Sequence, residues 1–141
     1  MFCHQELAIM ISIFSRFLSV MALVIIASFL SQGVKAQNQE IKGMTGGNNN
    51  SGDCGYIADQ PNYILQLNQQ AYSLNVSVET PAGKPSLLIL GPGESDRFCI
   101  LGDAKSGKNP QMGGVWAPGK YLIYVGDSQG SQNPFTLRIS P

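Results

Sequence analysis

The sequence predicts an all-β domain, an antiparallel β-sandwich or jelly-roll-like fold with seven to eight short strands and one disulfide. Short apolar runs recur from residue 54 onward and are separated by turns rich in glycine, proline and asparagine. Several of these runs alternate apolar and polar residues with a period of two, which is typical of half-buried strands. No helical period appears in this part of the chain. Together these observations favour two packed antiparallel sheets.

The stretch 116–126 is expected to supply the central strand. Pro118 suits the second position of a turn because its φ is fixed, and Gly119 tolerates the positive φ of the third position of a type II turn. Apolar residues then occupy both faces of the strand, with Tyr121, Ile123 and Val125 on one face and Leu122 and Tyr124 on the other. We therefore predict structural roles for this turn and strand, carried by Trp116, Pro118, Gly119 and Tyr121. The alternative for Trp116 is a stacking surface for a sugar or a base.

The remaining strands are expected on both sides of this one. They are residues 63–67, 72–79, 86–90, 97–101, 112–116 and 135–140. The cleanest alternation lies in 72–79, where we expect Tyr72, Leu74, Val76 and Val78 to face the core. The segment between residues 126 and 130 resembles the serine elbow of hydrolases. A strand and Pro134 follow it instead of a helix, so we interpret it as a hairpin turn.

Residues 1–36 have the pattern of a signal peptide. An apolar run over residues 17–30 follows Arg16, and Val34-Lys35-Ala36 places small residues where a signal peptidase cleaves. We expect cleavage after Ala36 and a protein that is secreted, periplasmic or held at the cell surface. The alternative is an uncleaved membrane anchor, in which case this segment alone would contact the membrane.

Residues 37–53 are predicted to be a flexible linker. The stretch is rich in glycine and asparagine and has almost no apolar side chains, so it has little surface to bury. The folded domain is then expected over residues 54–141.

Cys54 and Cys99 are the two cysteines of the predicted mature chain, since Cys3 lies in the signal segment. In an exported domain such a pair is expected to form a disulfide. A redox or metal-binding thiol pair is the alternative, but the wide spacing and the absence of histidine after His4 disfavour it.

Composition excludes some classes of function. The formal net charge is zero and only 13% of residues are charged, so no basic patch is available for nucleic acid. We expect no cofactor, no metal site and no catalytic residues. The alternative is a small hydrolase or peptidase inhibitor that uses carboxylates, for which the available side chains are Asp53, Asp59, Asp96, Asp103 and Asp127. All five lie in turn-rich stretches, where aspartate is common.

Five segments of this sequence resemble the bacterial pre-peptidase C-terminal domain, especially small exported cyanobacterial versions. They are residues 87–92, Cys99, Asn109-Pro110, 116–126 and 134–139, and the likeness covers about 54–141. The resemblance implies a jelly-roll-like sandwich that usually accompanies secreted peptidases and serves targeting, binding or processing. No peptidase accompanies the domain in this chain.

The resemblance also raises calcium binding, because collagenase-associated members have a calcium-stabilised form. Here only Asp103 and Asn109 stand in the relevant loop as obvious oxygen donors, and Lys105 and Lys108 oppose a cation. We therefore expect no specific calcium site. The function predicted is that of a non-catalytic exported module with an unknown protein or glycan ligand.

Overall fold

The structure is a computed structural model that describes residues 38–141. The predicted signal peptide lies outside the described residues. No helix within 38–141 is long and apolar enough to cross a membrane. The regular elements are ten strands and one short 3-10 helix: β1 Gln39–Met44, β2 Asn49–Asn50, β3 Tyr56–Ile57, β4 Tyr63–Leu67, β5 Ala71–Glu79, β6 Pro85–Leu90, β7 Arg97–Leu101, η2 Ala104–Ser106, β8 Gln111–Trp116, β9 Gly119–Asp127 and β10 Pro134–Ser140.

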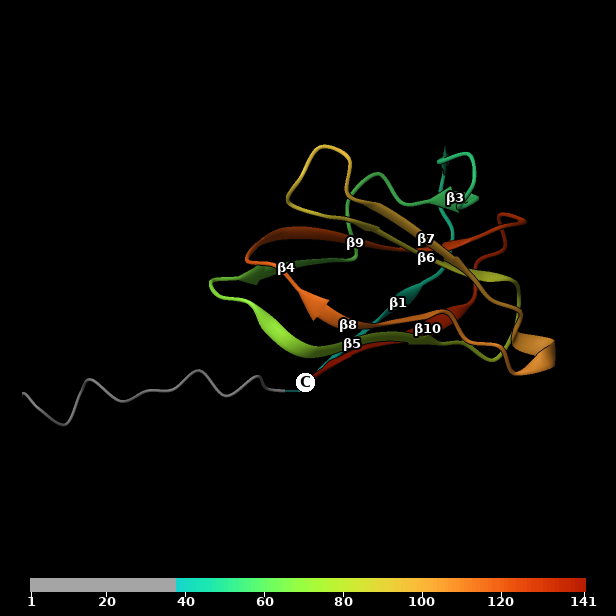
Figure 1. The fold of residues 1–141 in the computed structure, drawn as a ribbon. Coiled ribbons are helices and arrows are strands. Elements are labelled where there is room, and N and C mark those ends of the chain that lie inside the picture. The colour runs from blue at the N-terminus through green and yellow to red at the C-terminus, as the bar shows by residue number, and fades with distance from the viewer. Residues whose placement is uncertain (1–37) are drawn as a thin grey trace, which may run out of the picture. The chain divides into compact units, whose positions relative to one another are not determined.

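The strands form two antiparallel sheets that pack face to face, and this confirms the predicted β-sandwich (Figure 1). A four-stranded sheet has the order β1-β10-β5-β8. The six-stranded sheet has the order β2-β3-β9-β6-β7, with β4 also paired to β9. The additional strands relative to the expected seven or eight are the first three, two of which consist of only two residues.

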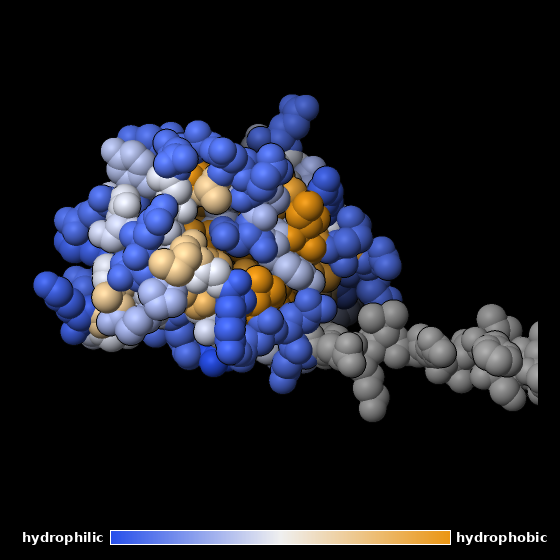
Figure 2. All heavy atoms as spheres, turned by 180° about the vertical axis from the view of Figure 1, so that it is seen from behind, coloured by the Kyte–Doolittle hydropathy of each residue, from blue (hydrophilic) through white to orange (hydrophobic). Residues whose placement is uncertain are grey.

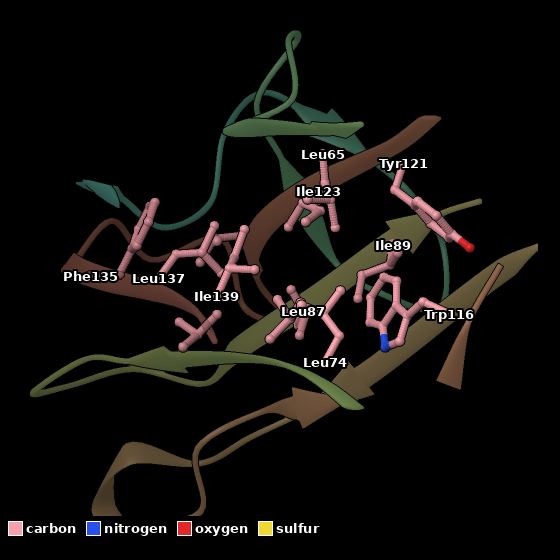
Figure 3. Close-up of a cluster of buried hydrophobic side chains, with 13 residues drawn as sticks. Leu65, Leu74, Leu87, Ile89, Trp116, Tyr121, Ile123, Phe135, Leu137 and Ile139 are labelled. Atoms are coloured by element: carbon pink, nitrogen blue, oxygen red, sulfur yellow. The ribbon is translucent and has the colours of Figure 1, made fainter. Parts of the chain in front are cut away.

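The predicted central strand is confirmed as β9, which pairs with β6 on one side and with β3 and β4 on the other. Its odd-numbered apolar residues enter the core between the sheets, where they meet side chains of β5, β6 and β10 (Figure 3). β6 is buried on both faces, as its continuous apolar run predicts. Each fully buried leucine or isoleucine here stabilises the fold by about 1.5–3 kcal/mol.

The linker prediction is wrong for residues 39–45. β1 pairs antiparallel with β10 along its whole length and turns Ile41 toward the core. At Gly43 the ring of Phe135 lies where a side chain would otherwise stand. Thr45 is buried at the end of the strand and donates from Oγ1 to the Ser131 carbonyl at 3.0 Å. Pairing to a distant strand thus orders a segment whose own composition suggests disorder.

The predicted inward position of Tyr72 is also wrong. The register between β5 and β8 shifts between Ala71 and Leu74, so a bulge breaks the alternation. Ala71 takes the inner position opposite Trp116, and the Tyr72 side chain is 78% exposed. Leu74, Val76 and Val78 point into the core as expected.

The segment from 127 to 130 is a turn, but β9 and β10 belong to different sheets, so it is a connection between sheets and not the predicted hairpin. Asp127 is fully buried and organises this connection. Its Oδ1 accepts from the amides of Gln129 at 2.8 Å and Ser131 at 3.1 Å, and its Oδ2 accepts from the amide of Lys84 at 2.9 Å. Three backbone donors thus satisfy the buried carboxyl group.

Candidate binding face on the four-stranded sheet

The disulfide predicted from the sequence is present between Cys54 and Cys99. It fastens the segment containing β2 and β3 to the edge strand β7. Two further contacts hold the same region: Ser86 Oγ donates to the Cys54 carbonyl at 2.6 Å, and the Arg97 guanidinium hydrogen-bonds to the Asp53 carboxylate. The bond from Arg97 holds the pKa of Asp53 below its usual value. The role of this disulfide is therefore in the architecture of the six-stranded sheet.

Trp116 and Tyr121, two of the residues predicted to be structural, lie together at the corner where the chain crosses from β8 in one sheet to β9 in the other. The rings of Trp116 and Tyr121 pack edge to face, with centroids 5.0 Å apart and an interplanar angle of 61°. The Tyr121 hydroxyl donates to the Ala117 carbonyl at 3.0 Å. Trp116 is only 4% exposed, so its ring is a core residue and offers no stacking surface.

Gly119 has two reasons to be glycine. Its φ is +144°, and a Cβ at this position would overlap the ring of Pro92 in the turn after β6. The corner is thus packed against the 91–93 turn.

The outer surface of the four-stranded sheet, which we call the polar face, carries the outward side chains of β1, β10, β5 and β8. Strand register places Glu40, Arg138, Ser77 and Gln111 in one row across all four strands. Their neighbours within each strand, such as Val76 and Leu137, are buried, so alternation turns this row toward solvent. The face therefore presents charge, hydroxyl and amide groups side by side.

Arg138 is held at the centre of the polar face by two carboxylates. Its Nη1 lies 2.5 Å from Glu79 Oε2 on β5, and its Nε lies 3.4 Å from Glu40 Oε2 on β1. The hydrogen bond to Glu79 raises the pKa of the guanidinium, which stays charged. Lys42 approaches Glu40 at 3.5 Å. Exposed pairs of this kind contribute little stability, but they fix the orientation of the guanidinium.

Tyr72 and Val115 add an apolar area at the other end of the polar face. Val115 on β8 is 64% exposed, and the register places it next to the bulge that carries Tyr72. The side of the molecule seen in Figure 2 is mostly hydrophilic, with apolar side chains visible between the polar ones.

A hollow of about 620 Å³ lies where β1, β5 and β10 meet at the edge of this face. Charged, hydroxyl, amide and proline side chains line it together: Lys42, Glu79, Thr80, Pro81, Asn109 and Pro134. Lys42 and Glu79 join the hollow to the network around Arg138.

The carboxylates considered for catalysis each have a structural partner. Asp127 is the buried centre described above. The other four accept hydrogen bonds from nearby groups: Asp53 from Arg97, Asp59 from Asn49, Asp96 from the Gly93 amide and Asp103 from the Lys105 amide. Turns and strand ends thus account for these aspartates, as their positions in the sequence suggest.

Asp103 and Asn109, the two oxygen donors considered for calcium, have different surroundings. Asp103 caps η2 and forms a β-bridge with Lys108, whereas Asn109 lines the hollow at the polar face. Within residues 38–141, no three histidine, cysteine, aspartate or glutamate side chains are grouped so as to hold a metal ion.

The chain is similar in sequence to one known protein and in fold to two solved structures. No family model matches the chain. An uncharacterized protein of Synechococcus elongatus is 46% identical over 110 residues, which cover 75% of this chain and 78% of that protein. The chain belongs to the same family as this cyanobacterial protein.

Two crystal structures share the fold of this chain. The pre-peptidase C-terminal domain of a Bacillus anthracis collagenase aligns with a TM-score of 0.51 and 20% identity, over 73% of this chain and 89% of that domain. The periplasmic inhibitor of g-type lysozyme from Aeromonas hydrophila aligns with a TM-score of 0.50 and 21% identity, over 79% of this chain and 91% of the inhibitor. The fold is therefore like that of the pre-peptidase C-terminal domain, as the resemblance in the sequence implies.

Sequence reasoning missed the polar face and its Tyr72. Glu40, Glu79 and Arg138 stand at outward positions of their strands, but only the pairing of three distant segments brings them together. The alternation in 72–79 predicts an inward Tyr72, and this prediction is wrong because a bulge leaves no clear trace in the apolar pattern.

Proposed function

We propose that this chain is an exported, non-catalytic module that binds a protein or glycan of the cell envelope or extracellular space through its polar face. The outward position of the Tyr72 side chain is the main support for this proposal. A regular β5 would bury this ring, yet the bulge turns it outward beside Val115 and next to an otherwise polar sheet surface. A tyrosine there offers a flat apolar ring and a hydroxyl for recognition.

The arrangement of polar groups supports the same role. Arg138 is held in place by carboxylates before any ligand arrives, so little side-chain entropy is lost when its free donors bind. The hollow beside Lys42 gives a ligand a second contact on the same face. Stacking, hydrogen bonding and charge are thus available along one surface.

Export is supported by the signal-like residues 1–36 and by the disulfide, because disulfides persist mainly outside the reducing cytosol. Cleavage after Ala36 would leave β1 intact, since this strand begins at Gln39. The non-catalytic role is supported by the structural hydrogen bonds of the five aspartates.

Glycan arrays and affinity capture from envelope extracts, each run with matched variants, test the proposal. Tyr72→Ser combined with Arg138→Ser should weaken saturable binding at least tenfold, whereas Tyr56→Ser should retain it. Tyr56 is the matched control because it is also partly exposed, at 37%, but lies on β3 of the other sheet. A ligand that binds the double variant as well as the wild type would contradict the assignment of this face.

The alternative functions predict other outcomes. A carboxylate-dependent hydrolase would turn over a substrate and lose activity when one of the aspartates is changed to asparagine. An inhibitor of a peptidase would also bind a protein, so inhibition of a captured enzyme would define the ligand class and not contradict the binding role.

A further inference from the structure

We propose that two copies of this chain pair through the free edge of β8, which would join the two four-stranded sheets into one continuous sheet. β8 has unpaired backbone groups along one edge, and none of its side chains is charged. The pairing does not depend on the ligand proposed above.

The direction of the backbone groups of β8 follows from one hydrogen bond. The Val78 amide donates to the Pro110 carbonyl at 3.0 Å, so Pro110 points toward β5. Because the groups of an antiparallel strand alternate, Met112 and Gly114 also point toward β5, whereas Gln111, Gly113 and Val115 point away from it. Among the described strands β8 pairs with β5 alone. These three residues are exposed, so their amides and carbonyls face solvent.

Two other edge strands of the sandwich, β1 and β7, carry charges that β8 lacks. Natural edge strands commonly carry charges or other features that prevent pairing with another chain. β1 carries Glu40 and Lys42, and β7 carries Arg97, which is paired with Asp53. Within β8, from Gln111 to Trp116, no residue is charged and none is proline.

β4 is also uncharged, but its free edge is shorter. The Val125 amide donates to Asn62 Oδ1 at 2.7 Å, so the odd-numbered residues of β9 point toward β4. Tyr63 and Leu65 pair with Ile123 and Tyr121, which leaves only Ile64 and Gln66 facing outward inside β4. β8 therefore offers the longer ladder.

A second copy fits this edge because the strand is complementary to itself. In a two-fold antiparallel pair centred on Gly113, that residue faces its counterpart and Gln111 faces Val115 of the other copy. The pairing forms on the order of six hydrogen bonds and opposes no like charges. It also places the two polar faces on one surface, with both Tyr72 side chains near the seam. The small contact implies a weak dimer that depends on concentration.

Cysteine scanning of the full chain, expressed with its own export segment, tests the pairing and its register. Residues that face each other in a hydrogen-bonded pair have Cα atoms about 5.5 Å apart, which a disulfide can bridge. Gly113→Cys should therefore give a covalent dimer on mild oxidation. A mixture of Gln111→Cys and Val115→Cys should cross-link more than either variant alone. A Cβ at Gly113 meets only the Asn75 side chain closely, at 3.2 Å, so the substitution should be tolerated.

Two controls make the test decisive. Ile64→Cys reports pairing through β4 and should remain monomeric. Gly113→Glu sets two like charges opposite each other and should lower the dimer fraction in sedimentation velocity by roughly tenfold, with an unchanged melting temperature. The proposal is overturned if the wild type stays monomeric at all concentrations and Gly113→Cys does not cross-link. Stronger cross-linking through Ile64→Cys would overturn it as well.

Discussion

Gly119 shows how one residue at the corner between the sheets combines a backbone requirement with a steric one. Its φ of +144° nearly equals the +146° of Gly114, but a Cβ at Gly114 has no atom within 4 Å, whereas one at Gly119 would overlap Pro92. The two glycines therefore form a matched pair that separates strain from overlap.

We predict that Gly114→Ala lowers the free energy of unfolding by about 1 kcal/mol through backbone strain, and that Gly119→Ala lowers it by about 2–4 kcal/mol. Gly119→Val should lose more, because a β-branched side chain resists positive φ. Urea denaturation of the three variants measures these differences. Equal losses at both alanine variants would show that Pro92 does not restrict the corner.

Tyr121 makes stability depend on alkaline pH. Burial raises the pKa of its hydroxyl above the usual value, and the charge of Asp96 acts in the same direction. A group whose pKa is raised on folding stabilises the fold fully below its unfolded pKa, about 10, and this contribution is lost as the pH rises through the folded pKa.

We predict that the wild type loses more stability than Tyr121→Phe as the pH rises above about 10. At neutral pH the variant should be less stable by about 1 kcal/mol, because the hydrogen bond to Ala117 is lost. Melting curves over this pH range make the comparison. Parallel pH profiles for the two proteins would exclude Tyr121 as the titrating group.

Asp103 is the carboxylate that would be expected to take part in a calcium site, and we expect no specific site of this kind. The Asp103 Oδ1 accepts a hydrogen bond from the Lys105 amide, so the Asp103 side chain already caps η2. We predict no saturable heat when calcium is titrated into chelator-treated protein. Saturable binding that Asp103→Asn abolishes would refute this, and Asp59→Asn is the matched control on another loop.

At the scale of elements, the disulfide and the segment it fastens form one unit. Cys54 is joined to Cys99 across 45 residues of sequence, and the segment that carries β2 and β3 has only short pairings of its own. The chain-entropy model gives a stabilisation of about 4 kcal/mol for a loop of this length.

We predict that the exported protein contains no free thiol at these two positions and that Cys54→Ser with Cys99→Ser speeds hydrogen exchange first in residues 49–57. Intact mass after alkylation under denaturing, non-reducing conditions counts the thiols. Two alkylated cysteines would disprove the bond in solution. Equal exchange in both proteins would show that it does not order this segment.

The strands differ in how far their own sequences predict them. β6 and β9 are predicted by their continuous apolar runs, and the structure buries β6 on both faces and β9 on the face of its odd-numbered apolar residues. β1 was missed because Ile41 is its main apolar contribution to the core and Gly43 makes room for Phe135, a residue about ninety positions away. The bulge at Tyr72 was missed because register is decided between strands, here by the partner β8. The local pattern thus identifies central strands, but not those whose order comes from pairing.

At the scale of the whole molecule, the sandwich separates stability from recognition. The apolar core and the connections around Asp127 hold the two sheets together, whereas the polar face carries side chains that the core does not need. Arg138, its two carboxylates and Tyr72 can therefore be changed without opening the core. This separation allows binding to be tested with variants that remain folded.

The most direct test of the proposed binding role is co-sedimentation of the exported protein with envelope material from the cell that produces it. We predict saturable binding by the wild type and by Tyr56→Ser, and at least a tenfold weaker affinity for Tyr72→Ser with Arg138→Ser, which corresponds to about 1.4 kcal/mol. All three proteins should melt at similar temperatures. Equal binding by the wild type and the double variant, or no saturable binding by any of them, would contradict a binding role for the polar face.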